Sequence, residues 1–308
     1  MKQIAKFIRE IELLNKPIRI GFPDGNDPRI LEVVKLLKDI KNIEPIIIED
    51  EYIKNLDKNK IITIFQKVRE GKNNTIQDFE KWVNIPNYVA MALLVNGDLD
   101  CVVGGATTPT ADLLRPALQI VQSRDKFITS YFWMNKEDEN YFMADCAIIP
   151  NPNQDQIIKM VKLLDKDIKN IYSVDNHIAL LSFSTNGSGG EADESILKMK
   201  NATIALKEEG YNVLGETQFD AAFDKTTRII KWKNNNLSRP NIYVFPDLNS
   251  ANIGYKIMKL TGGYEAVGPF ILGLNLPVND LSRGADIKEI FNTSIITILS
   301  AIKRKKNG

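Results

Sequence analysis

The chain has 308 residues, of which 40 are basic and 39 acidic, so its formal net charge at pH 7 is +1. This balance gives no electrostatic reason to expect a nucleic-acid partner. A chain of this length can bury a large core, and its length suggests two domains.

No uncharged apolar run reaches the length that spans a bilayer, and the charged N-terminal stretch lacks the apolar core of a signal peptide. The two cysteines, Cys101 and Cys146, lie in apolar runs typical of buried, reduced thiols. We therefore expect a cytoplasmic protein with no membrane partner.

The first third of the chain alternates apolar runs with helical patterns. Ile18 to Phe22 predicts a strand, and Asp27 followed by Pro28 predicts the start of a helix. Apolar runs at residues 43–48, 61–65 and 99–105 predict further strands. This β-α-β order favours a parallel sheet. The chain has no GxGxxG fingerprint, so a dinucleotide site is not expected.

The turn after the run at residues 99–105 is a candidate anion site. Thr108 is the predicted N-cap of a helix, with Pro109 as its first residue. A glycine and threonine turn at a helix start offers free backbone N–H groups to an anion. Arg115 strengthens this interpretation, because a guanidinium binds phosphate through two hydrogen bonds. A plain connection that binds nothing is the alternative.

The middle of the chain begins with a predicted hairpin of two apolar strands, at residues 128–134 and 141–150. His177, the only histidine, starts another strand, so neither a Ser-His-Asp triad nor a histidine-rich metal site is supported. We expect no metal. Ser184 and Thr185 open a glycine-rich loop that is either a phosphate nest or a flexible connection.

The last third places polar residues after two apolar strands, at residues 242–245 and 269–274. Asn249 or Ser250 is expected to cap the helix between them, which ends at Gly262 and Gly263. Strand ends of a parallel sheet meet at one edge, which is where ligands bind in such folds. The polar residues predicted at this edge are Asp247, Asn249, Asn279, Ser282 and Arg283.

Several separated segments, in order, resemble those of phosphate acetyltransferases (phosphotransacetylases). The two most specific are FPDLNSANIGYK (245–256) and PVNDLSRG (277–284). The others are TADLLRPALQIV (110–121), ADCAIIPNPNQ (144–154), ALLSFSTNG (179–187) and GETQFDAAF (215–223).

The resemblance implies reversible transfer of an acetyl group between coenzyme A and phosphate, by direct thiolate attack in a ternary complex. It also implies two α/β domains with mainly parallel sheets and an interdomain cleft, as in isocitrate and isopropylmalate dehydrogenases. We expect one domain to comprise residues 1–128 and 276–308, and the other 129–275. Coenzyme A would be a substrate, no cofactor would be tightly bound, and the enzyme would be a homodimer.

The resemblance also implies roles for individual residues. Ser282 would donate a hydrogen bond, Arg283 would hold the phosphate or carbonyl oxygen, and Glu289 stands where the family has its aspartate base. Asp286 and Glu289 also have the spacing of a helix capping box, and Asp286 is the other candidate base. Asn186 stands where the family usually has a lysine. The residues expected to bind substrate are Arg69, Arg115, Thr108, Ser184, Thr185, Asp247, Asn249 and Asn279.

Two alternatives stay open at this point. A phosphate butyryltransferase would share the fold and differ in its acyl pocket, and a non-catalytic sensor of coenzyme A or acetyl phosphate would share the scaffold. The dehydrogenases of similar fold need a set of metal-binding aspartates and a nucleotide loop that the sequence lacks.

Overall fold

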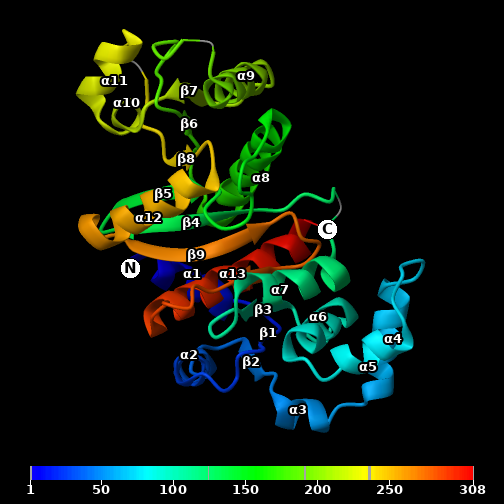
Figure 1. The fold of residues 1–308 in the computed structure, drawn as a ribbon. Coiled ribbons are helices and arrows are strands. Elements are labelled where there is room, and N and C mark those ends of the chain that lie inside the picture. The colour runs from blue at the N-terminus through cyan, green and yellow to red at the C-terminus, as the bar shows by residue number, and fades with distance from the viewer. Residues whose placement is uncertain (1, 124, 191, 235–236, 308) are drawn as a thin grey trace. The chain divides into compact units, whose positions relative to one another are not determined.

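The computed structural model describes residues 2–123, 125–190, 192–234 and 237–307 (Figure 1). The chain divides into two compact units, one of residues 1–126 with 267–308 and the other of residues 127–266. The boundaries predicted from the sequence lie after residues 128 and 275. Among the described residues, no helix is long and apolar enough to cross a membrane.

The first unit has a four-stranded sheet in which every strand is parallel to its neighbours, in the order β10-β3-β1-β2. The strands are β1 (Ile18–Phe22), β2 (Ile43–Ile47), β3 (Cys101–Gly104) and β10 (Val278–Asp280). The helices are α1 (Lys2–Glu12), α2 (Pro28–Lys38), α3 (Asp50–Lys54), α4 (Lys58–Val68), α5 (Ile76–Trp82), α6 (Pro86–Asn96), α7 (Thr110–Pro116) with the π-helix η1 (Ala117–Val121) after it, and α13 (Ile287–Asn307).

Local signals explain most of these elements. Asp27 caps α2 by accepting a hydrogen bond from the backbone of Arg29, as predicted. The strand predicted at residues 61–65 is wrong, because this run lies inside α4. Ile61 and Phe65, four residues apart, are the buried positions of α4, and Asp57 caps its start.

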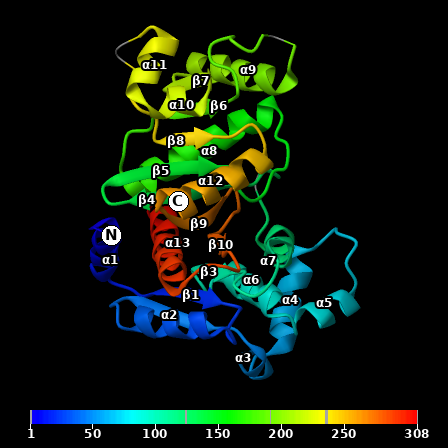
Figure 2. The same cartoon turned by 60° about the vertical axis from the view of Figure 1, so that its left-hand side comes forward.

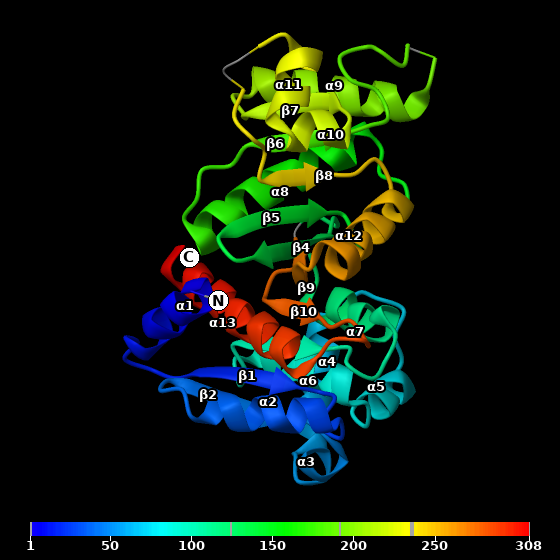
Figure 3. The ribbon, with the colours of Figure 1, turned by 90° about the vertical axis from the view of Figure 1, so that its left-hand side faces the viewer.

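The C-terminal helix α13 packs through a broad apolar face. Ile290, Ile295 and Ile298 are fully buried. The helix contacts α1 and α2 as well as strands β1 and β3. Figure 3 shows the red helix beside α1. Helix α13 therefore forms part of the core of the first unit.

The second unit is a mixed sheet with strands in the order β7-β6-β8-β5-β4. The predicted hairpin is present as the antiparallel pair β4 and β5, whereas β5, β8, β6 and β7 run parallel. The strands are β4 (Thr129–Lys136), β5 (Glu139–Ala144), β6 (Ile178–Leu181), β7 (Val213–Thr217) and β8 (Ile242–Val244). The helices are α8 (Gln154–Tyr172), α9 (Glu194–Glu208), α10 (Phe219–Phe223), α11 (Lys225–Trp232) and α12 (Leu248–Gly262).

Helix α12 lies against β4 and β5 (Figure 2). Tyr255 of this helix stacks on Phe132 of β4 with ring centroids 4.2 Å apart. The cap of α12 is Asp247, not Asn249 or Ser250, and the helix ends at Gly263 in the left-handed conformation that glycine favours. Strand β9 (Glu265–Leu272) then carries the chain from the second unit into the first. The α/β prediction with mainly parallel sheets is confirmed.

Candidate active site

The loops after β1, β3 and β10 gather at the carboxyl edge of the sheet in the first unit, because these neighbouring strands are parallel. This is the edge at which ligands bind in sheets of this kind. The three loops carry Asp24, Thr107 with Thr108, and Ser282 with Arg283. Three anchoring side chains hold them together.

Asp24 is the first of these anchors. One of its carboxylate oxygens accepts from the backbone N–H of Gly105 (2.7 Å) and Ala106 (3.3 Å). The other accepts from the backbone N–H (3.2 Å) and the hydroxyl (2.5 Å) of Thr107. The backbone donors of Gly105, Ala106 and Thr107, which the sequence offered to an external anion, are therefore satisfied by an internal carboxylate. That part of the prediction is wrong.

Thr108 was predicted to be the N-cap of α7, and that prediction is wrong. The cap position is Pro109 and the helix begins at Thr110, because proline fixes the extended backbone just before the first turn. The Thr108 hydroxyl oxygen is buried and has no hydrogen-bond partner among the described residues. Thr108 lines a cavity of about 440 Å³ together with Arg115, so this hydroxyl is a donor that a ligand can use.

Arg69 and Arg115 come together around Tyr88. Tyr88 donates to the side-chain oxygen of Gln119 (2.5 Å), and Arg69 donates to the backbone oxygen of the same glutamine (3.3 Å). Burial raises the pKa of Tyr88, while the positive charges of Arg115 and Arg69 oppose that rise. Arg115 is exposed and lines the cavity, whereas Arg69 is half-buried and also bonded to Asn74. Arg115 thus contributes a cation to the cavity wall, and Arg69 places a second cation near Tyr88, which also lines the cavity.

Asp280 is the second anchor. This buried carboxylate ends β10 and accepts a hydrogen bond of 2.6 Å from the hydroxyl of Thr110, at the start of α7. Burial raises its pKa to about 6, against the opposing effect of the Thr110 hydroxyl and with a further rise from the charge of Asp24. Asp280 therefore ties the strand that leads into Ser282 to the helix that carries Arg115.

Arg29 is the third anchor, and it reaches across the chain. One guanidinium nitrogen donates to the carbonyl oxygens of Arg283 and Ala285, both at 2.8 Å, and the other to that of Ala106 at 2.9 Å. Its charge is balanced by Asp27 at 2.7 Å. The backbone of the turn at residues 282–285 is therefore fixed by the hydrogen bonds from Arg29. The side chains of Ser282 and Arg283 remain exposed.

Asp286 and Glu289 form the capping box that was the alternative interpretation. The backbone N–H of Glu289 donates to the Asp286 carboxylate (2.8 Å), and the backbone N–H of Asp286 donates to the Glu289 carboxylate (3.2 Å). Glu289 is buried and Asp286 is exposed. The cap fixes the Glu289 carboxylate in the first turn of α13, five residues after Gly284.

Asn279 belongs to the core of the first unit. Its amide donates to the hydroxyl of Thr297 in α13 (2.8 Å) and accepts from the backbone of Ile271 (2.7 Å). The oxygen and the nitrogen of this buried amide therefore both have partners within the protein. Asn279 faces away from the side of the sheet to which its neighbours in β10 point, because alternate residues of a strand face opposite sides. We correct its assignment from substrate contact to structural support.

In the second unit, the loop after β6 closes on Glu216. The buried Glu216 carboxylate accepts from the Ser184 hydroxyl (3.1 Å) and from the backbone N–H of Gly187 (2.6 Å). The backbone N–H of Asn186, in the left-handed region with a φ of 48°, donates to the Glu216 carbonyl (3.2 Å). As at Asp24, a carboxylate of the protein accepts from a backbone N–H group, here that of Gly187, which the sequence analysis had predicted to bind phosphate.

The other predicted ligands of this unit have structural partners or are exposed. The hydroxyl of Thr185 donates to the side chain of Gln218 (3.1 Å), and its backbone N–H donates to Ser188. Asp247 caps α12 by accepting from the backbone of Ser250 (2.8 Å). Asn249 is exposed in the first turn of α12. Ser184 and Asp247 still follow neighbouring parallel strands, β6 and β8, and so share one edge.

Sequence reasoning missed Asp24, Arg29, Asp280 and Tyr88. Asp24 gave no local signal, because the backbone N–H groups that it accepts from lie 81 to 83 residues away. Asp280 lies inside the PVNDLSRG segment that carried the resemblance. Arg29 gave no signal, because its carbonyl partners in the 283–285 turn lie 254 and 256 residues away.

Comparison with known proteins agrees with this arrangement. Residues 1–298 match the protein family described as Phosphate acetyl/butaryl transferase. The chain is 38% identical to a phosphate acetyltransferase of Mycoplasma capricolum, over 97% of this chain and 99% of that protein. A phosphotransacetylase structure from Streptococcus pyogenes is 36% identical and covers 98% of this chain and 99% of its own, with a TM-score of 0.87.

A 4-hydroxythreonine-4-phosphate dehydrogenase from Burkholderia phymatum is similar in fold alone. It is 12% identical, covers 94% of this chain and 98% of its own, and has a TM-score of 0.50. The full-length match and the close relatives together decide the family. The chain belongs to the phosphate acetyl/butyryl transferase family.

Proposed function

We propose that the protein is a phosphate acetyltransferase, which transfers an acetyl group reversibly between coenzyme A and phosphate. One observation carries this proposal. The turn of Ser282 and Arg283, fixed by hydrogen bonds from Arg29, lies at the same sheet edge as the cavity lined by Arg115 and Thr108. The relatives named phosphate acetyltransferase support the choice of acetyl over butyryl. The direct test is formation of the thioester from acetyl phosphate and coenzyme A by the purified protein.

The chemistry needs no covalent enzyme intermediate. In the direction of thioester synthesis, the thiolate of coenzyme A attacks the carbonyl carbon of acetyl phosphate. The S–C bond forms, the C–O bond to phosphorus breaks, and phosphate leaves with the electron pair. Coenzyme A is a substrate in this scheme, so no tightly bound cofactor is required. An ordinary thiol has a pKa near 8.5, so a base that takes its proton accelerates the reaction.

We assign the base to Glu289. A carboxylate in this role contributes roughly 10²–10⁴-fold to the rate. The capping box supports the assignment because it holds the carboxylate in one orientation beside the Ser282 turn. Ser282 then donates to the carbonyl oxygen on which negative charge develops, and Arg283 binds phosphate. Asp286, which is exposed at the cap, is the alternative base.

Arg69 and Arg115 bind the phosphate groups of the substrates in this proposal. Arg115 acts in the cavity together with the buried hydroxyl of Thr108. Arg69 stands behind it and is oriented by Asn74 and Gln119. Both are arginines, whose planar fork suits phosphate oxygens better than a lysine does.

We also propose that the enzyme is a cytoplasmic homodimer. Both cysteines are buried and unpaired, as suits a reducing compartment. Helix α12 exposes Ile253, Ile257 and Leu260 by 58%, 56% and 80%, and this spacing places them on one face. A second copy would bury that face. Light scattering of Ile257→Glu tests it: the variant should be monomeric, whereas Ile204→Glu on α9, which is also exposed, should remain a dimer.

A further inference from the structure

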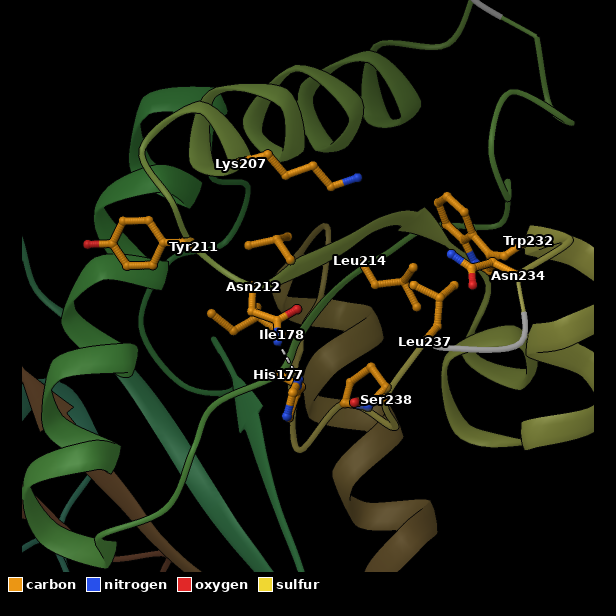
Figure 4. A pocket seen from close by; sticks show the side chains of 12 residues that line it. His177, Ile178, Lys207, Tyr211, Asn212, Leu214, Trp232, Asn234, Leu237 and Ser238 are labelled. Carbon is orange, nitrogen blue, oxygen red and sulfur yellow. Dashed lines mark hydrogen bonds between the residues drawn. The ribbon is translucent and has the colours of Figure 1, made fainter.

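A second cavity, of about 370 Å³, lies in the second unit at the amino ends of β6 and β7 (Figure 4). Ile178 and Val213, the first residues of these strands, both line it. The loop of Ser184 and the Glu216 carboxylate belong to the opposite ends of the same two strands. The cavity is therefore separate from the edge described above, and its volume is within the range of small-molecule sites.

About half of the side chains that line this cavity are apolar, and they include the aromatic ring of Trp232. Leu214 and Leu237 face it from β7 and from the segment before β8, and Trp232 closes one side (Figure 4). The indole N–H of Trp232 donates to the hydroxyl of Thr217 (3.3 Å), which fixes the ring plane. Such a surface suits a flat apolar group, because aromatic rings stack on planar partners.

The charged and polar lining favours a negative ligand. Lys207 is the one charged side chain among the described residues that line the cavity, and none of them is an aspartate or glutamate. Lys207 lies in the last turn of α9, where a cation also suits the helix dipole. Lys207 is exposed and forms no ion pair with a described residue. Its ammonium group can therefore bind an anion.

His177 adds a directed hydrogen-bond donor. The side-chain amide of Asn212 donates to Nδ1 of His177 (2.5 Å), as the dashed line in Figure 4 marks. A neutral imidazole that accepts at Nδ1 carries its proton on Nε2. The backbone of His177 is held in turn by Asn241 (2.8 Å). His177 thus presents a fixed N–H group at the edge of the cavity.

We propose that this cavity binds a small organic anion with a flat apolar body, an aromatic phosphate or carboxylate. The anionic group pairs with Lys207, the flat body lies against Trp232 and Leu214, and His177 donates to an acceptor on the ligand. None of the described residues that line the cavity is acidic, and each of the three interactions comes from a side chain that lines it. This site is independent of the acetyl transfer proposed above.

The probe is phenyl phosphate, and the reporter is the imidazole of His177, which gives one histidine signal because the chain has a single histidine. We expect saturable movement of this proton signal with a dissociation constant of about 1 mM. Lys207→Met should weaken binding about 10-fold through loss of the charged contact. Lys207→Arg, which keeps the charge, should bind nearly as well. Phenol, which lacks the anion, should bind far more weakly than phenyl phosphate.

Arg115→Met separates this cavity from the candidate active site, because Arg115 lines the other cavity. Binding that persists in Arg115→Met and weakens in Lys207→Met supports the proposal. Three results would overturn it: no movement of the His177 signal up to about 10 mM phenyl phosphate, equal binding by Lys207→Met, or loss of the movement in Arg115→Met.

Discussion

The guanidinium of Arg29 donates a 2.8 Å hydrogen bond to the carbonyl oxygen of Arg283, and a second of the same length to that of Ala285. Arg29 follows the loop after β1, whereas Arg283 follows β10 at the end of the chain. The contact therefore sets where the turn of Ser282 and Arg283 lies relative to the β3 loop, which the same guanidinium reaches at Ala106. We regard Arg29 as a positioning residue.

Replacing Arg29 tests this role. Arg29→Met should lower kcat about 100-fold, because a shift of about 1 Å in a catalytic group has an effect of that size. Arg29→Lys keeps the charge but cannot form all of the forked bonds, so it should recover only part of the rate. Steady-state kinetics with acetyl phosphate and coenzyme A measure both.

The matched control is Arg19→Met. Arg19 lies on β1, the strand that precedes the loop leading to Arg29, and donates to Asp100 and to the Gly97 carbonyl. It should lower the urea midpoint by an amount similar to that of Arg29→Met and leave kcat unchanged. Equal losses of kcat in both variants would mean that Arg29 acts only through stability.

Thr108 offers a test that separates binding from stability. Its buried hydroxyl oxygen has no partner among the described residues, so Thr108→Val should leave the urea midpoint unchanged or raise it. The same change should lower kcat/KM about 10-fold by removing a donor to the substrate. Thr107→Val is the control: its hydroxyl already donates to Asp24, so it should lose stability. Unchanged kcat/KM in Thr108→Val would remove Thr108 from the site.

Asp280 predicts how stability changes with pH. Burial raises its pKa to about 6 in the folded protein, above the ordinary aspartate value. Between about pH 4 and 6, the folded state keeps a proton that the unfolded state has lost, so the free energy of unfolding falls as pH rises. The contribution is about 3 kcal/mol at most.

Asp280→Asn should remove this part of the pH dependence, because the amide does not titrate. Urea unfolding of both proteins at about pH 4.5 and about pH 7 measures the difference. The variant should lose less stability over this range than the natural protein does. Parallel losses in the two proteins would show that Asp280 does not hold the proton.

Glu289 and Asp286 are distinguished by amide substitutions. Glutamine also serves at the third helical position of a capping box, so Glu289→Gln should change the urea midpoint little. As the proposed base, it should lose roughly 10²–10⁴-fold in kcat with coenzyme A affinity retained. Asp286→Asn, whose amide still caps the helix, should keep most of its activity. The reverse pattern would make Asp286 the base, and full activity in Glu289→Gln would reject our assignment.

The elements that the sequence predicted well depend on neighbouring residues. The cap at Asp27, the hairpin of β4 and β5, and the helix end at Gly263 all follow from local patterns. The run at 61–65 misled because β-branched residues favour strands, whereas tertiary packing of Ile61 and Phe65 selects a helix.

The predicted site was less complete for a related reason. Glycine and hydroxyl turns identify loops with free backbone donors, but they do not reveal which distant carboxylate accepts from them. Asp24 is 81 residues from Gly105, and Glu216 is 29 residues from Gly187. Only the folded chain brings these pairs together, so both turns looked like external anion sites. The side chains of Ser282 and Arg283 remain exposed, so a substrate can reach them.

The central claim is acetyl transfer between phosphate and coenzyme A. The most direct measurement is the rate of thioester formation by the purified protein, given coenzyme A with acetyl phosphate and, separately, with butyryl phosphate. We predict turnover with acetyl phosphate that exceeds turnover with butyryl phosphate and that is lost in Arg283→Met. Faster turnover with butyryl phosphate would assign the protein to the butyryl branch of its family. Tight coenzyme A binding without turnover of either substrate would contradict the enzymatic claim and indicate a sensor.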